Sequence, residues 1–323
     1  MKQILVKRCS VFLLIYAIGV SLIGLACGRN AQSADPNFDA AVAHPAYVNE
    51  HPRVLFDEAH NNIHKTRGLY KPFADLIAND GYRVTPNKEK FSAQMLSEFD
   101  ILVIANALGT NDSNDSSAFT AQECDAVRDW VTAGGALLLI TDHFPTGAAA
   151  AELAKRFGVE MSKGMTFDSL HYDHTSGDDT QLEFTRANGL LMKHAIIEGR
   201  NESERLNHLV TFTGQSLRAP DGGATLMNLS DAAVDRSAMV KVEKSGGDTR
   251  VIIDYGAPVS AAGRAQAVAL EHGQGRVVVL GEAAMLTAQL DGRTKKPFGM
   301  NVAGIDNRQF ALNLMHWLSR LLN

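Results

Sequence analysis

Residues 134–143 read GGALLLITDH, and this segment combines a helix stop, an apolar strand and two polar side chains. The paired glycines end a helical pattern, because glycine favours the position just after a helix. The apolar run 136–141 predicts a strand that is covered on both faces, as strands of parallel sheets are. Asp142 and His143 then follow the strand, where ligands bind in open α/β sheets.

The same arrangement extends toward the N-terminus. Helical spacing at 69–79 and 120–133, and an alanine-rich pattern that ends at Phe157, predict three helices, and a capping box formed by Thr120 and Glu123 predicts the start of the second. Short apolar runs predict three more strands, at 53–57, 82–85 (ended by Pro86) and 101–105. Strands that alternate with helices indicate a parallel α/β sheet.

The second half of the chain reads differently. Residues 209–212 and 238–242 alternate as half-buried strands do, and 265–280 predicts a hairpin around Gly273-Gln274-Gly275. A last helix is expected from about Asn307 to Leu321, with Asp306 or Asn307 as its N-cap. Residues 160–206 show no clean period. We therefore predict one domain, 53–323, in which 160–260 is a less regular, β-containing insertion or appendage.

The N-terminus predicts an export signal over residues 1–26. Lys2, Lys7 and Arg8 precede an uncharged stretch, 9–26, that ends in small residues. Cys27 stands at the lipid-acceptor position of a permissive bacterial lipobox, so the chain is expected in the periplasm or at the outer membrane as a lipoprotein. Plain cleaved export and an uncleaved anchor remain alternatives. Polar residues up to position 52 read as a tether.

Charge and cysteine content exclude several classes of protein. The net charge is −5, and removal of the signal would lower it further, so a nucleic-acid partner is not expected. Only Cys27 and Cys124 would remain, which excludes a four-cysteine zinc site. Contact with a membrane is expected only through the signal or the lipid.

Polar side chains follow four of the predicted strands. If the sheet is parallel, they meet at its carboxyl edge and form a candidate acid–base site. The candidate catalytic residues are Asp57, His60, Asp142, His143 and Glu282. Each also has a structural interpretation: Asp57 as a helix cap, Asp142-His143 as a turn before Pro145, and Glu282 as a surface residue.

Further residues near the same edge are candidates for ligand or metal binding. The expected ligand contacts are Glu58, Asn61, Asn106 and Asn301. His60 and His64 lie four residues apart, so on a helix they would share a face. With Asp142 and His143 they would supply the ligand types that zinc or another divalent metal prefers.

Other motifs are weaker. Asp168, His171, Asp173 and His174 form a second histidine–acid group, which we interpret as a solvated loop rather than as metal ligands. There is no Walker loop or dinucleotide-binding fingerprint, and no complete G-x-S-x-G nucleophile elbow surrounds Ser216 in Gly214-Gln215-Ser216-Leu217. A serine hydrolase is therefore not expected.

The first half of the chain resembles the class I glutamine amidotransferase-like superfamily, in particular its secreted, trehalose-utilisation-type branch. The resemblance rests on residues 54–57, 99–104 and 130–142 and covers roughly 53–158. It implies a flavodoxin-like, mostly parallel sheet with helices on both faces. The superfamily places a nucleophilic cysteine after the strand that matches 137–141, but Asp142 stands there and Cys124 lies on a predicted helix. Glutamine hydrolysis through a thioester is therefore not expected.

Two functional hypotheses remain open. The first is an envelope hydrolase with an acid–base or metal site, for which a glycan or an amide is a plausible substrate. The second is a non-catalytic module that binds a small molecule, a glycan, a peptide or a partner protein. The two differ in whether Asp57, His60, Asp142 and His143 converge on one pocket or bond to their own backbone.

Overall fold

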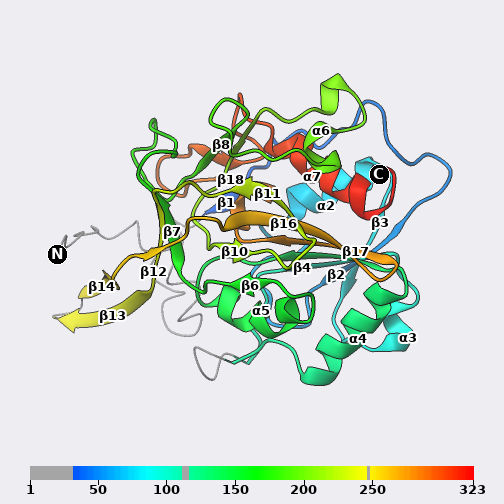
Figure 1. Cartoon of the computed structure of the whole chain (residues 1–323), viewed down its shortest axis with the longest axis horizontal. Helices are drawn as coiled ribbons and strands as arrows, with labels where there is room; N and C mark the ends of the chain where they lie inside the picture. The colour runs from blue at the N-terminus through cyan, green and yellow to red at the C-terminus, as the bar shows by residue number, and fades with distance from the viewer. Residues whose placement is uncertain (1–31, 111–115, 246–247) are drawn as a thin grey trace.

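The computed structural model describes residues 32–110, 116–245 and 248–323, so the predicted signal peptide and Cys27 lie outside the described residues. Its centre is a nine-stranded sheet (Figure 1). Five strands form the parallel part, in the spatial order β3-β2-β4-β5-β17: β3 (Arg83–Asn87), β2 (Arg53–Asp57), β4 (Ile101–Ala105), β5 (Ala136–Ile140) and β17 (Gly275–Leu280). Numbered along the chain, this order is 2-1-3-4-5, which is the flavodoxin-like order.

Helices cover both faces of this sheet, as expected. Alternate residues of each strand point to opposite faces, so Phe56 packs with α2 (Lys71–Asn79) and α7 (Asn307–Leu318). Leu55 contributes to the opposite core, which three other helices cover: α3 (Ala93–Leu96), α4 (Ala121–Thr132) and α5 (Thr146–Lys155). Figure 1 shows these two helical layers above and below the sheet.

The antiparallel part of the sheet comes from the second half of the chain. The predicted hairpin is present as β16 (Ala265–His272) and β17, and β16 joins the sheet to strands that follow α5. These are β6 (Glu160–Met161), β10 (Leu217–Arg218) and β11 (Ala224–Asn228). Part of the region predicted as less regular therefore extends the main sheet.

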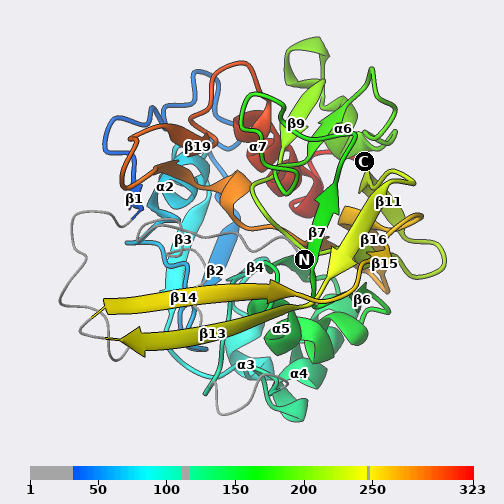
Figure 2. The same ribbon diagram turned by 90° about the vertical axis from the view of Figure 1, so that its left-hand side faces the viewer.

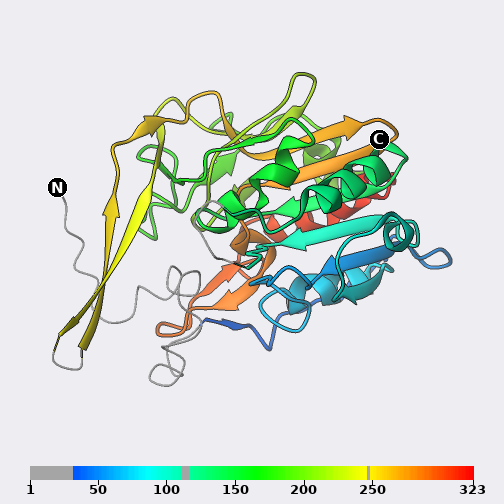
Figure 3. The ribbon, with the colours of Figure 1, turned by 90° about the horizontal axis from the view of Figure 1, so that it is seen from below.

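The remaining elements form small sheets and short helices around this core. One sheet is β15 (Val259–Ser260), β12 (Ala233–Arg236) and β7 (Met165–Asp168), and another is β1 (Ser33–Ala34), β18 (Ala288–Leu290) and β19 (Pro297–Gly299). Two pairs are β8 (Glu183–Thr185) with β9 (His208–Val210), and β13 (Ala238–Ser245) with β14 (Asp248–Tyr255). The short helices are α6 (Ala195–Glu198), η1 (Glu202–Glu204) and η2 (Ala284–Leu286). The β13–β14 ribbon projects from the body (Figures 2 and 3).

Three local expectations need correction. Pro86 does not end its strand, because β3 is an edge strand and tolerates a residue without an N–H donor. Asp306 is the N-cap residue of α7, as expected, but its carboxylate makes no capping hydrogen bond and accepts the backbone N–H groups of Asn207 and His208 instead. Asp168 is buried at the end of β7, where its carboxylate accepts the Ser230 hydroxyl, so it is not part of a solvated loop. In the part of the chain that is described, no helix is long and apolar enough to cross a membrane.

Candidate functional site

The in-register ends of the parallel strands place the candidate residues at one edge of the sheet. Ala105, Ile140 and Leu280 are aligned across β4, β5 and β17. Asn106 follows Ala105 directly, and Asp142 and Glu282 each stand two residues beyond their strands. Asp57 is the last residue of neighbouring β2. Four segments that are far apart in sequence thus deliver polar groups to the carboxyl edge.

Asp57, His60 and Glu123 form a buried network, which we call the histidine clasp. His60 Nδ1 lies 2.9 Å from both carboxylate oxygens of Asp57, and His60 Nε2 lies 2.9 Å from Glu123 Oε1. Burial lowers the pKa of His60, but the hydrogen bonds and charges of Asp57 and Glu123 outweigh it and raise the pKa. Both ring nitrogens face carboxylate oxygens, which is an arrangement that favours the cationic imidazole.

Two phenylalanine rings and the start of α4 cover the histidine clasp. The rings of Phe91 and Phe119 each lie 4.7 Å from the His60 ring, centroid to centroid. Glu123 also completes the capping box of α4, in which its carboxylate accepts the backbone N–H and the hydroxyl of Thr120. His60 is 5 % exposed. The clasp thus joins the loop after β2 to the start of α4, and its groups have no free face toward solvent.

Asn62 and Asn106 connect the histidine clasp to the next strand. Asn62 Nδ2 donates to Asp57 Oδ2 at 3.0 Å, while Asn62 Oδ1 accepts the backbone N–H of His60. Asn106 has a φ of 47°, a left-handed conformation that asparagine tolerates better than most residues. Its Oδ1 accepts the backbone N–H of Asp142 at 2.8 Å. Asn106 therefore shapes the turn after β4 and β5.

Asp142 and Glu282 form a second buried group, which we call the acid pair. Glu282 is fully buried, and its two oxygens accept the backbone N–H groups of Ala284 and Met285 at 2.6 and 2.8 Å. Burial, and then the negative charge of Asp142, raise the pKa of Glu282 well above its usual value. Burial also raises the pKa of Asp142. Burial therefore opposes ionisation of both carboxyl groups, and like-charge repulsion adds to this effect at Glu282.

His143 does not join the histidine clasp. Its Nδ1 lies 2.7 Å from its neighbour's carbonyl oxygen, Phe144 O, and its Nε2 lies 3.8 Å from Asp142 Oδ1. The Asp142 carboxylate in turn accepts the backbone N–H of His143 at 2.8 Å. This is the turn-like arrangement that the sequence left open as an alternative. Asp142 and His143 are bonded locally rather than directed at a shared ligand.

Three polar atoms around the acid pair are buried without a hydrogen-bond partner: His64 Nδ1, Thr213 Oγ1 and Gln266 Nε2. Burial lowers the pKa of His64 to about 3, so this ring is neutral. The ring stacks on Tyr70, whose hydroxyl donates to Ala283 O, next to Glu282. Unmet polar groups in a folded protein call for an explanation and are one feature of functional sites.

Backbone strain coincides with these unmet groups. Thr213 has a φ of 83°, which is rare for a β-branched residue. The adjacent Gly214 is so closely packed that a Cβ there would lie 2.9 Å from both Gln266 Nε2 and Glu282 Cβ. The acid pair therefore lies in a tight, strained part of the edge.

The other predicted ligand residues have local structural partners. Glu58 Oε1 accepts the backbone N–H and hydroxyl of Thr66. Asn61 is exposed in a left-handed conformation, with a φ of 52°. Asn301 Nδ2 donates to Asp35 and to the backbone of Gln289, in the β1–β18–β19 sheet, so it bonds there and not to the edge groups.

The expected metal ligands are not assembled. Both nitrogens of His60 are engaged by Asp57 and Glu123, and His64 lies against Tyr70 on the side of the acid pair. Within residues 32–110, 116–245 and 248–323, no group of three or more His, Cys, Asp or Glu side chains is arranged to hold a metal ion. The proposed set of His60, His64, Asp142 and His143 therefore does not form one ligand sphere.

Cys124 lies in α4, as expected, and has no nucleophilic character. It is buried and unpaired, and burial raises the pKa of its thiol to about 11. Asp142, not a cysteine, follows β5, and Cys124 is the one cysteine among the described residues.

Several residues of the edge were missed from the sequence. Glu123 was recognised only as half of a capping box, although it also binds His60. Tyr70, Thr213 and Gln266 lie in segments whose patterns gave no hint of the carboxyl edge. A strained threonine and a buried glutamine have no one-dimensional signature, because their roles depend on strands that pair across the fold.

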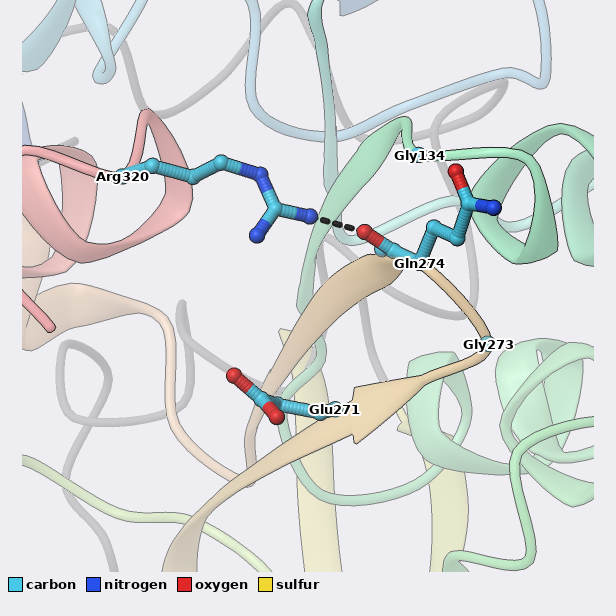
Figure 4. Close-up of a pocket in the computed structure, with 6 residues that line it drawn as sticks. Gly134, Glu271, Gly273, Gln274 and Arg320 are labelled. Atoms are coloured by element: carbon cyan, nitrogen blue, oxygen red, sulfur yellow. Dashed lines mark hydrogen bonds between the residues drawn. The ribbon is translucent and has the colours of Figure 1, made fainter.

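One surface pocket lies at the opposite, amino-terminal edge of the sheet. It has a volume of about 440 Å³ and is bordered by Gly134, by the β16–β17 turn and by Arg320. Figure 4 shows Arg320 directed at the carbonyl of Gln274, to which it donates a hydrogen bond, with Glu271 turned away. Backbone and glycines dominate this pocket, and it is not connected with the candidate residues.

Comparisons with known proteins concern the fold. No family model matches the chain, and no curated protein matches its sequence. Among solved structures, the mmIFT52 N-terminal domain matches with a TM-score of 0.55 at 13% identity, over 83% of this chain and 97% of that one. A protein from Bacteroides uniformis described as thua-like matches with a TM-score of 0.41 at 13% identity, over 85% and 95%. A Thermoplasma acidophilum protein described as a GMP synthase component matches with a TM-score of 0.42 at 10% identity, over 85% and 97%. The first of these likenesses shows a shared mixed α/β architecture, and at such identities none of them transfers an activity.

Proposed function

We propose that this chain is a non-catalytic ligand- or partner-binding domain of the cell envelope, built on a flavodoxin-like, amidotransferase-like core. The supporting observation is that its strongest candidate catalytic groups are already engaged. The ring nitrogens of His60 and the carboxylate oxygens of Glu282 all bond to groups of the protein itself. A general base needs a free lone pair within reach of a substrate proton, but both ring nitrogens of His60 are engaged and Glu282 is fully buried.

The test combines turnover with stability. Wild type, His60→Gln and Glu282→Gln are assayed with p-nitrophenyl glycosides, p-nitrophenyl esters and p-nitroanilides, and their unfolding is followed in urea. We expect no turnover above the blank. Because the network is structural, His60→Gln should lower the free energy of unfolding by about 2 kcal/mol or more. Turnover by the wild type that disappears in a stably folded variant would overturn the proposal.

A hydrolase is the second candidate, and the acid pair favours it. Asp142 and Glu282 have raised pKa values, and the unmet atoms of His64, Thr213 and Gln266 lie around them. A carboxyl group that stays protonated near neutral pH can act as a general acid. In this case Asp142→Asn would abolish turnover of one of the same substrates while the protein stays folded. Equal rates in wild type and Asp142→Asn would exclude the acid pair as the catalyst.

We also propose export and lipid attachment at Cys27. The support is the sequence alone: a basic start, an uncharged stretch over 9–26 and a cysteine at the lipobox position. The test is metabolic labelling with palmitate in a bacterial host, with Cys27→Ala as the comparison. Label and membrane association that are lost in Cys27→Ala support the proposal, and equal fractionation without label contradicts it.

A further inference from the structure

A second pocket lies on the face of the sheet that α2 and α7 cover. It has a volume of about 610 Å³, within the usual range for small-molecule sites. Three segments form its walls: residues 42–46, the loop 200–204, and one face of α7 that carries Arg308, Leu312 and His316. Asp80 also lines it, at the C-terminal end of α2, whereas Tyr70, near the acid pair, precedes the other end. The pocket is thus separate from the carboxyl edge.

The segment 42–46 is held in place as a strap across α2 and α7. The backbone N–H of Ala46 donates to Asp80 Oδ1 at 2.8 Å, and the backbone N–H of Tyr47 donates to Asp80 O at 3.1 Å. On the other side, Arg308 donates to Ala41 O at 2.6 Å. These anchors lie outside the local chain, so the strap forms a defined wall of the pocket.

Both acidic side chains that line the pocket are already compensated. Asp80 Oδ2 lies 2.7 Å from His316 Nε2, and both residues are 1 % exposed. Glu204 forms a multiple hydrogen-bonded ion pair with Arg200. Burial opposes ionisation of Glu204, but the hydrogen bonds from Arg200 lower its pKa below the usual value. Both carboxylates are thus hydrogen-bonded by other side chains of the protein.

Arg308 differs from these pairs. In residues 32–110, 116–245 and 248–323, it forms no ion pair, and its one hydrogen bond there uses a single guanidinium nitrogen. The half-buried guanidinium of Arg308 therefore borders the cavity and has further N–H donors for a ligand. Asn201 and Gln309 add amide groups to the same lining. In addition, His316 Nδ1 is buried without a partner, so the wall contains an unmet polar atom.

We propose that this pocket binds a small polar molecule through an oxyanion, either a carboxylate or a phosphate, which the Arg308 guanidinium holds. The planar fork of arginine pairs with two oxygens of such a group at once. The amide groups of the lining suit a hydrogen-bonding remainder rather than an apolar one. This inference rests on the proposed binding function and names the class of ligand for it.

The test is calorimetric titration of the purified full chain at constant ionic strength, with inorganic phosphate in one arm and succinate in the other. We expect saturable binding of at least one anion. Charge-assisted hydrogen bonds are among the strongest hydrogen bonds in proteins, so Arg308→Gln should weaken binding about tenfold or more. Arg308→Lys should lose less, because it keeps the charge without the fork. Arg67→Gln, which removes an exposed arginine outside the pocket, should bind as the wild type does.

The outcomes separate the possibilities. Binding of phosphate alone assigns a phosphate-bearing ligand, and binding of succinate assigns a carboxylate. No saturable binding of either anion overturns the inference, as does an equal loss in Arg308→Gln and Arg67→Gln. Turnover of the chromogenic substrates, by contrast, would overturn the proposed non-catalytic function. It would not change what the titration shows about anion binding to the pocket. The two failures are therefore distinguishable.

Discussion

Substitution of Glu123 by glutamine tests whether the histidine clasp stabilises the fold. The carboxylate accepts hydrogen bonds from His60 Nε2 at 2.9 Å, from the backbone N–H of Phe91 at 3.1 Å and from Thr120. In Glu123→Gln, an amide of the same shape would lose its charge beside the imidazolium. It would also turn donors toward groups that are themselves donors, which leaves buried polar groups unpaired.

The magnitude follows from the pKa of Glu123. Burial raises it, but the hydrogen bonds from Thr120 and His60 outweigh burial and lower it from 4.5 to about 2. At about 1.36 kcal/mol for each pKa unit, the folded state gains at most about 3 kcal/mol from this carboxylate. Because the pKa is depressed, this stabilisation is complete above pH 4.5 and is lost as the pH falls toward 2.

The assay is urea unfolding of wild type and Glu123→Gln at pH 7 and at pH 3. We expect the variant to be less stable by about 2–3 kcal/mol at pH 7, and the difference to shrink by more than half at pH 3. Glu50→Gln is the control, since Glu50 is exposed and should show no difference at either pH. A loss below about 0.5 kcal/mol at pH 7, or a difference that does not change with pH, would refute the reasoning.

Three further predictions concern stability. Burial lowers the pKa of His64 to about 3, so protonation of this ring opposes folding in acid. Between pH 7 and pH 5, the free energy of unfolding of the wild type should therefore fall by about 2 kcal/mol relative to that of His64→Phe, which has no proton to gain. The same pH dependence of stability in both proteins would contradict this. The raised pKa of Asp142 means that its ionisation costs stability as the pH rises above the ordinary value of 3.8, so the free energy of unfolding of Asp142→Asn should increase relative to the wild type as the pH rises from there, in the same urea assay. Gly81 and Gly134 both have left-handed backbones, but a Cβ at Gly81 would lie 2.0 Å from Tyr47 O whereas one at Gly134 meets nothing within 4 Å. Gly81→Ala should therefore be the more destabilising, and equal melting temperatures would disprove it.

The sequence predicted the core of the fold because its strands are short apolar runs between clear helix signals. Residues 136–141 and 101–105 became central, fully buried strands, and the Thr120–Glu123 capping box begins α4 as expected. The 2-1-3-4-5 order could not be derived this way, since a buried strand carries no mark of its neighbours. Most strands of the small sheets in the second half could not be predicted either, because strands of two to four residues are too short to show a periodic pattern.

The sequence alone determined which polar residues follow the strands, and hence that Asp57, Asn106, Asp142 and Glu282 stand at one edge. Only the tertiary structure decided that these residues belong to two separate buried groups. His60 lies between Asp57 and Glu123, a residue 63 positions away, while Glu282 and Asp142 are buried separately, where the charge of Asp142 raises the pKa of Glu282. The physical reason is that burial and charge pairing depend on distances between segments, whereas the sequence records only order along one chain. Whether a histidine holds the fold together or meets a ligand is therefore decided by what packs around it.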